Sequence, residues 1–152
     1  MRRRSTRTST SPTRCSSTRS LTVLGIDPGT TGMGYALLEL DRDPPRLVRC
    51  GLVPTPRDGS AAERLLGIAN ALDALIAEHA PGALALERLY FNKNVKTAMS
   101  VAEARGIALV CGARAGLQIA EYTPQEVKQS VTGNGGSEKK AVQLMIRHIL
   151  KL

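Results

Sequence analysis

The chain reads LTVLGIDPG at residues 21–29, and this stretch decides how the rest of the sequence is interpreted. Residues 21–26 form a short apolar run that is closed by Asp27 and a Pro-Gly turn, a pattern typical of a buried strand. The whole chain has 152 residues, which is enough to bury one sizeable core but hardly two. We therefore expect a single domain, residues 21–152, built outward from this strand.

Two further strands are predicted directly after the first, at residues 34–40 and 47–53. Because the connections between them are short, the three strands should form an antiparallel meander. A capping box of Ser60 and Glu63 then opens a helix that ends at a Pro-Gly pair. The apolar stripe of this helix should face the core and consists of Leu65, Ile68, Leu72, Leu75 and Ile76.

The remaining elements alternate between strands and helices. We expect a buried strand at 83–86, a helix at 96–114, a strand at 117–122, a helix opened by a capping box of Thr123 and Glu126, and a last helix that Ser137 caps and that runs to the chain end. Strands reached through a helix should join the sheet in parallel, with right-handed crossovers. The order predicts an α/β fold, a mixed five-stranded sheet flanked by helices, which resembles ribonuclease-H-like domains.

The first twenty residues differ from everything that follows. They contain six arginines, no acid and almost no apolar side chain, so we expect this basic tail to be disordered. Three interpretations are open: a nucleic-acid-binding arm, an organellar transit peptide, or a spurious extension from an upstream start codon. Because the tail has no apolar stripe, we favour the dispensable extension and assign the tail no function.

Composition excludes several classes of protein. No stretch approaches the roughly 18 consecutive apolar residues that a membrane span needs. The three cysteines are odd in number and form no C-x-x-C pair, which excludes a disulfide framework and a zinc ribbon and indicates a reducing, cytoplasmic compartment. Beyond the tail, residues 21–87 are acidic and residues 88–152 are basic. The acidic half could supply metal ligands and the basic half phosphate contacts, or the surface charge could be dispersed by chance.

Two carboxylates follow apolar strands in the acidic half. Asp27 ends the first predicted strand and Glu87 the fourth, so the two would converge if those strands are neighbours. Converging carboxylates on rigid elements are how proteins hold Mg²⁺ for phosphoryl chemistry. Each residue alone also has an ordinary explanation, because Asp before Pro-Gly is common in turns and Glu87 could pair with Arg88 at the surface.

Four separate stretches resemble, in the right order, the RuvC family of crossover-junction endodeoxyribonucleases. They are residues 25–29, residues 86–91 with Lys93 and Asn94, residues 103–106, and residues 127–129 followed by Gly133, Glu138 and Lys139. The resemblance implies a homodimer that resolves four-way (Holliday) DNA junctions in recombination and repair. It also implies paired symmetric nicks that leave 5′-phosphate and 3′-hydroxyl ends, two Mg²⁺ per subunit with Mn²⁺ as a substitute, and the RuvA–RuvB branch-migration complex as a partner.

The resemblance assigns roles to individual residues. Asp27 and Glu87 match the first two catalytic, metal-binding acids of the family. Tyr90, Phe91 and Lys93 match a loop that opens base pairs at the crossover, although an aromatic pair can equally pack in a core. Lys128 and Lys139 match positions that meet DNA near the scissile phosphate, although most lysines on helices simply face solvent. The cluster at 133–136 resembles a phosphate-cradling loop, and hinge turns look the same.

The family carries a further acidic pair beyond the stretch that matches Lys139, and this chain ends at Leu152 before it. The resemblance therefore implies a truncated sequence that is a poor or inactive nuclease, because two carboxylates cannot readily hold two Mg²⁺ ions. The alternative function is a junction-binding protein without nuclease activity. The stretch at 25–32 also resembles the first phosphate loop of actin-like ATPases, but those proteins need a longer chain and a second glycine-rich loop.

The helix at 97–110 is the expected dimer surface. Its small residues Ala98, Ala102, Ala104 and Gly106 permit close approach of a second backbone, unless they merely pack on the sheet. Met99, Ile107 and Val110 are expected to share the apolar face of the same helix.

Overall fold

The computed structural model describes residues 21–28, 32–54, 59–88 and 95–152. A five-stranded sheet forms its centre, with β1 (Thr22–Pro28), β2 (Met33–Glu39), β3 (Arg46–Val53), β4 (Ala83–Glu87) and β5 (Gln118–Tyr122) in the spatial order β3-β2-β1-β4-β5. β1, β2 and β3 pair antiparallel, whereas β4 and β5 add in parallel next to β1. The predicted element order, the meander and the mixed sheet are therefore confirmed.

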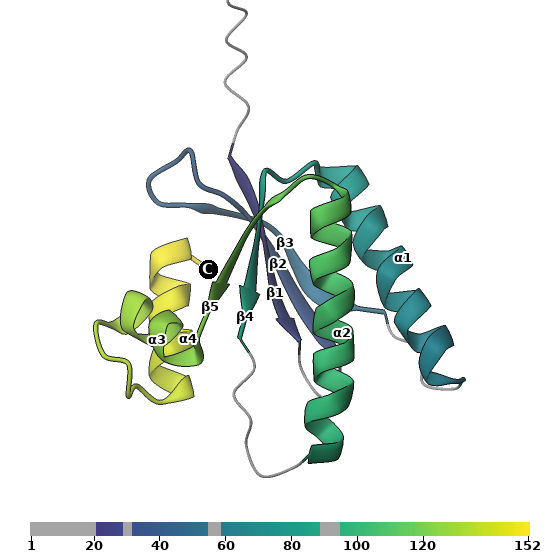
Figure 1. The fold of residues 1–152 in the computed structure, drawn as a ribbon. Coiled ribbons are helices and arrows are strands. Elements are labelled where there is room, and N and C mark those ends of the chain that lie inside the picture. Colours follow the sequence, from purple (N-terminus) through teal and green to yellow (C-terminus); the bar gives the residue numbers. More distant parts are fainter. Residues whose placement is uncertain (1–20, 29–31, 55–58, 89–94) are drawn as a thin grey trace, which may run out of the picture.

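Helices α1 (Ala61–His79) and α2 (Val95–Arg114) cover one face of this sheet (Figure 1). The capping box of Ser60 and Glu63 is present at the start of α1, as predicted. Alternation along the strands sends one set of side chains into the core between sheet and helices. The buried residues of that core include Leu24, Ile26, Leu37, Ile68, Leu72, Leu84 and Leu86.

Helix α2 lies close against β4 because residue 112 is a glycine. A Cβ atom built on Gly112 would lie 2.6 Å from Cδ2 of the buried Leu84. The buried face of α2 consists of Val101, Ala104, Ala108 and Cys111. The predicted apolar face is therefore right only for Ile107, which packs against the core. It is wrong for Met99 and Val110, which are 62% and 57% exposed.

Helices α3 (Pro124–Thr132) and α4 (Lys139–Leu150) form a separate pair beside β5 (Figure 1). We call residues 123–152 the helical arm and the sheet with α1 and α2 the sheet body. The predicted capping box of Thr123 and Glu126 opens α3, but neither helix of the arm contains a buried residue. Both helices end at a C-cap residue in the left-handed backbone conformation, Gly133 after α3 and Lys151 after α4.

The predicted cap of the last helix is wrong. Glu138 occupies the N-cap position of α4 and makes no side-chain capping hydrogen bond. The hydroxyl of Ser137 instead lies 2.7 Å from the hydroxyl of Thr132, because it completes the turn between the two helices. No helix in the described part of the chain is long and apolar enough to cross a membrane.

Candidate functional site

The parallel pairing of β1 with β4 brings the two predicted acids together. Ile26 is the register partner of Leu86, so Asp27 and Glu87 follow on neighbouring strands at the same end of the sheet. Ile26 and Leu86 both point into the core. Because side chains alternate along a strand, Asp27 and Glu87 emerge on the opposite face, away from α1 and α2.

The electrostatics of the pair show that the two carboxyl groups face each other. The pKa of Glu87 is raised, mainly by burial, and then by the negative charge of Asp27 and a hydrogen bond with it. Asp27 is exposed and Glu87 is half-buried. Two like charges held together on rigid strands attract a cation or a proton. The predicted convergence of these residues is therefore present in the structure.

Small residues line the sheet face around the acids. Gly25, Gly34, Ala36 and Ala85 lie on the strands beside them and are only half-buried. The backbone can therefore be approached closely from this side. In the described residues, no group of three or more His, Cys, Asp or Glu side chains is placed to hold a metal ion. The carboxyl pair fits a hard divalent cation, which would need water, substrate or other oxygen atoms to complete its shell.

A cluster that sequence reasoning missed lies directly beyond Glu87. Nε of Arg88 is 3.7 Å from Oε2 of Glu121 on β5, and the same oxygen forms an ion pair with Arg105 on α2. Arg88 therefore pairs with Glu121, and the expected surface pair with Glu87 is not among the ion pairs of the described residues. The parallel register of β4 and β5 and the packing of α2 bring these three residues together, so no local pattern could have indicated the cluster.

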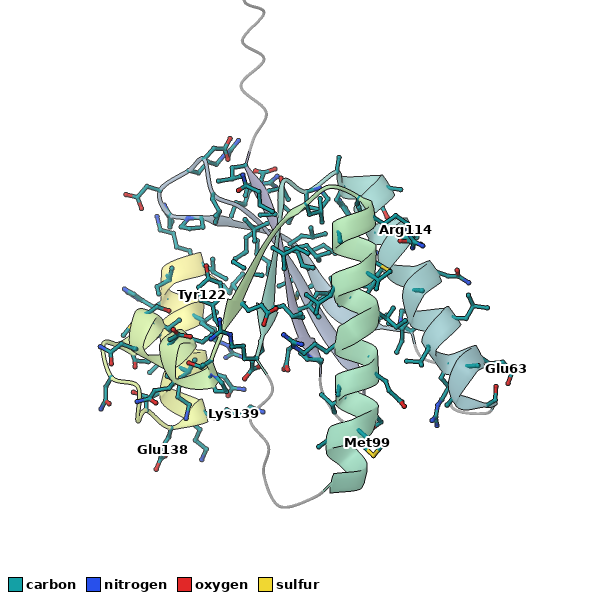
Figure 2. All side chains as sticks on the ribbon, viewed as in Figure 1. Glu63, Met99, Arg114, Tyr122, Glu138 and Lys139 are labelled. Carbon is teal, nitrogen blue, oxygen red and sulfur yellow. The ribbon has the colours of Figure 1, made fainter. Side chains whose placement is uncertain are left out.

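The two predicted DNA-binding lysines belong to the helical arm. Lys128 is half-buried on α3 and Lys139 is the exposed first residue of α4. Figure 2 places Lys139 at the end of the molecule toward which β1, β4 and β5 run. No salt bridge in the described residues uses either lysine. Among the residues that the structure describes, both positive charges are therefore available to an anionic partner.

The glycine-rich turn at 133–136 is not a phosphate cradle. The backbone N–H groups of Gly135 and Gly136 donate to side-chain oxygens of Gln129 and Asn134 at 2.8 and 2.9 Å. The N–H groups of residues 133, 134 and 137 also donate to oxygens within the arm. Because the donors of the turn are satisfied internally, the expected resemblance to an anion-binding loop is wrong. The remaining predicted site residues, Tyr90, Phe91 and Lys93, lie outside the described residues.

Comparison with known proteins identifies the family. The family model described as crossover junction endodeoxyribonuclease RuvC matches residues 23–152. The chain belongs to the RuvC family. A curated relative from Heliobacterium modesticaldum is 46% identical over 87% of this chain and 82% of its own length, and one from Roseiflexus sp. is 46% identical over 85% and 77%. Both relatives are named crossover junction endodeoxyribonuclease RuvC, the name of a nuclease that acts on DNA phosphodiester bonds.

Solved structures agree with this membership of the RuvC family. A Thermus thermophilus RuvC in complex with a Holliday junction substrate matches with a TM-score of 0.80 and 33% identity, over 87% of this chain and 81% of that one. The yeast mitochondrial Holliday junction resolvase Ydc2 has a TM-score of 0.63 at 14% identity, which shows a shared fold alone. The expected ribonuclease-H-like fold class is confirmed.

Proposed function

We propose that this RuvC protein is a structure-selective endonuclease that resolves four-way DNA junctions in recombination and repair by paired symmetric nicks. The observation that carries the proposal is the convergence of Asp27 and Glu87 on adjacent parallel strands of a chain from this family. The acids emerge on the sheet face that is lined by small residues, where a DNA backbone can approach. Hydrolysis there would leave 5′-phosphate and 3′-hydroxyl ends.

RuvC family nucleases depend on divalent metal ions. In this chain Asp27 and Glu87 would hold the metal, with Mg²⁺ as the proposed ion, two per subunit, and Mn²⁺ as a substitute. When bound, such ions supply an activated water and balance the charge that develops on the phosphate oxygens. The protein contributes the placement of the two carboxylates, since the strand ends fix their backbones.

The basic residues would bind and position the DNA. Lys128 and Lys139 would stabilise negative charge near the scissile phosphate, and their lack of carboxylate partners in the described residues leaves their charges available. Tyr90 and Phe91 would stack on bases opened at the crossover, with Lys93 on the neighbouring phosphates. The acids come from the sheet body and the lysines from the arm, so DNA would lie between these two regions.

Helix α2 is the proposed homodimer surface. Met99, Ala102, Gly106 and Val110 recur along one side of the helix; none of them is buried, and a Cβ atom on Gly106 would meet no atom within 4 Å. Ala104, by contrast, packs in the core and is removed from the predicted interface. A two-fold axis at this surface would present two equivalent sites to a near-symmetric junction. We also propose the RuvA–RuvB complex as a partner and the cytoplasm as the location.

The alternative, a junction-binding protein that does not cut, has no support, because the family model and both relatives carry the name of an endonuclease. The experiment that separates the two uses the full chain with a synthetic four-way junction and a duplex of the same sequence. We expect a mobility shift of the junction in EDTA and paired nicks when Mg²⁺ is added. Binding without any nick would support the alternative, and equal affinity for junction and duplex would refute both.

A further inference from the structure

Arg88 is anchored on the sheet immediately beyond the carboxyl pair. Its backbone N–H donates a 2.8 Å hydrogen bond to the carbonyl of Tyr122, which extends the pairing of β4 with β5 past the last residue of β4. The base of this side chain is therefore fixed by the same two strands that carry Glu87 and Glu121. Because its backbone is tied to β5, a group that Arg88 binds would be held at a fixed place relative to Glu87.

The side chain of Arg88 shares its acidic partner with a second arginine. Oε2 of Glu121 forms its close ion pair with Arg105, whose side chain is largely buried on α2, and lies 3.7 Å from Nε of Arg88. The longer separation is an ion contact but exceeds the range of a hydrogen bond. One carboxylate thus faces two guanidinium groups, and the cluster keeps a surplus positive charge that is located mainly on Arg88.

The free end of Arg88 is open to a ligand. Its side chain is 56% exposed, and its guanidinium makes no hydrogen bond within the described residues. The pKa of Glu126 at the start of α3 is lowered, mainly by the backbone N–H and hydroxyl of Thr123, and also by the charge of Arg88. The charge of Arg88 therefore lies near the start of the arm. An exposed, planar guanidinium without hydrogen-bond partners in the described residues suits the paired oxygens of a phosphate.

We infer that Arg88 binds a DNA backbone phosphate beside the carboxyl pair, and that Glu121 and Arg105 are positioning residues that orient its guanidinium. The inference rests on the proposed function, because it requires DNA to reach the carboxyl ends of β1 and β4. The competing explanation is an ordinary surface ion pair, of the kind that contributes little to stability and nothing to binding.

The test measures how junction affinity depends on salt. The full chain is titrated against a fluorescent four-way junction in EDTA over a series of NaCl concentrations. Each phosphate contact contributes about 0.9 to the slope of log affinity against log salt. We expect Arg88→Gln to reduce the slope by about 0.9 for each bound protomer, and affinity at 0.15 M salt to fall about fivefold per contact. Arg88→Lys should keep the slope because it keeps the charge.

Arg49→Gln is the matched control. Arg49 is 49% exposed and pairs with Glu78 at 3.3 Å, but it lies on the edge strand β3, far along the sheet order from β4. Its loss should leave the salt slope unchanged. If Arg88→Gln and Arg49→Gln give the wild-type slope alike, the inference is overturned. If the wild-type chain binds the junction no better than duplex DNA, the proposed function fails first, so the two failures are distinguishable.

Glu121→Gln tests the positioning role, because the two explanations predict opposite changes in junction affinity. Removing an acid near bound DNA should strengthen binding if only overall charge matters. If Glu121 orients Arg88, the same change should weaken binding severalfold, and it should have no weakening effect when Arg88 is already Gln. Stronger binding in Glu121→Gln would contradict the positioning role. Thermal unfolding of each variant is the control, and melting temperatures close to that of the wild type would show that weaker DNA binding does not come from unfolding.

Discussion

The sheet body and the helical arm share a local sequence signal, the capping box, but differ in how much of each helix is buried. A complete capping box begins both α1 and α3. Helix α1 then buries Ile68, Leu72 and Leu75 in the core, whereas neither helix of the arm has a buried residue. The difference teaches that capping decides where a helix begins, while burial decides how firmly it is held. The body is the rigid frame for the acids, and the arm presents lysines from a locally stabilised surface.

The largest expected difference between the two regions is catalytic. In the proposed mechanism, Asp27→Asn removes a metal ligand from the body, and junction cleavage should fall on the order of 10²- to 10³-fold or more while junction binding is preserved. Lys128→Gln on the arm should slow cleavage less and leave metal affinity unchanged. Single-turnover nicking and Mg²⁺ titration measure both effects. Normal nicking by Asp27→Asn, or a lost metal site in Lys128→Gln, would break the division of roles.

The cost of removing a leucine side chain should be larger in the buried sheet body than in the exposed arm. Leu84 in β4 is 2% exposed, whereas Leu144 in α4 is 72% exposed. Leu84→Ala should therefore cost about 2–5 kcal/mol of unfolding free energy, because it leaves a cavity in the core. Leu144→Ala should change it by less than about 0.5 kcal/mol. Urea denaturation followed by circular dichroism gives both values, and similar losses would mean that the exposed face of α4 is held by contacts of its own.

The capping boxes allow a closer comparison of the two regions. Ser60→Ala and Thr123→Ala each remove the side chain that accepts the N3 backbone N–H, at a cost of about 1 kcal/mol. In α1 the loss should lower the stability of the whole body, since that helix is packed into the core. In α3 it should appear as local opening. Hydrogen exchange by residue separates the two, and faster exchange confined to α1 after Ser60→Ala would contradict this account.

The smallest effect expected is on pH dependence. The pKa values of Glu63 and Glu126 are both lowered from 4.5, first by the hydrogen bond from the backbone of the cap residue. A lowered pKa means that the folded state binds the proton less tightly, so the stabilisation is present above pH 4.5 and is lost as pH falls through the lowered value. The protection factors of the α3 amides, which correct for the intrinsic pH dependence of exchange, should fall over that range. Glu126→Gln should reduce the pH dependence of protection in α3 but not in α1. An unchanged pH dependence in α3 would contradict the role of the Glu126 carboxylate.

Most of the fold could be predicted because its signals are local or periodic. The apolar strand before Asp27, the box at Ser60 and the alternation of strands with helices indicate the sheet directly. The convergence of Asp27 with Glu87 also followed, because parallel strands end at the same edge of a sheet. The buried face of α2 could not be predicted in the same way. Larger apolar residues were expected to face the core, but Gly112 and other small residues allow the helix to pack closely on the sheet.

The rest of the site depends on contacts between residues distant in the sequence. Arg88, Glu121 and Arg105 meet only through the register of β4 with β5 and the packing of α2. Ser137 failed as a cap because its hydroxyl is satisfied by Thr132 across a turn. The glycine cluster resembled an anion site because a glycine-rich sequence indicates free backbone N–H donors. The sequence does not indicate that side-chain oxygens, such as that of Gln129, accept hydrogen bonds from these donors.

The central claim is that Asp27 and Glu87 form one divalent-cation site, and thermal unfolding with and without metal tests it most directly. In EDTA, Glu87→Gln should raise the melting temperature above that of the wild type, by about 3 °C per kcal/mol gained, because it removes the repulsion between the acids. Millimolar Mg²⁺ should then raise the melting temperature of the wild type and leave Glu87→Gln nearly unchanged. An equal response of both proteins to Mg²⁺ would contradict the claim.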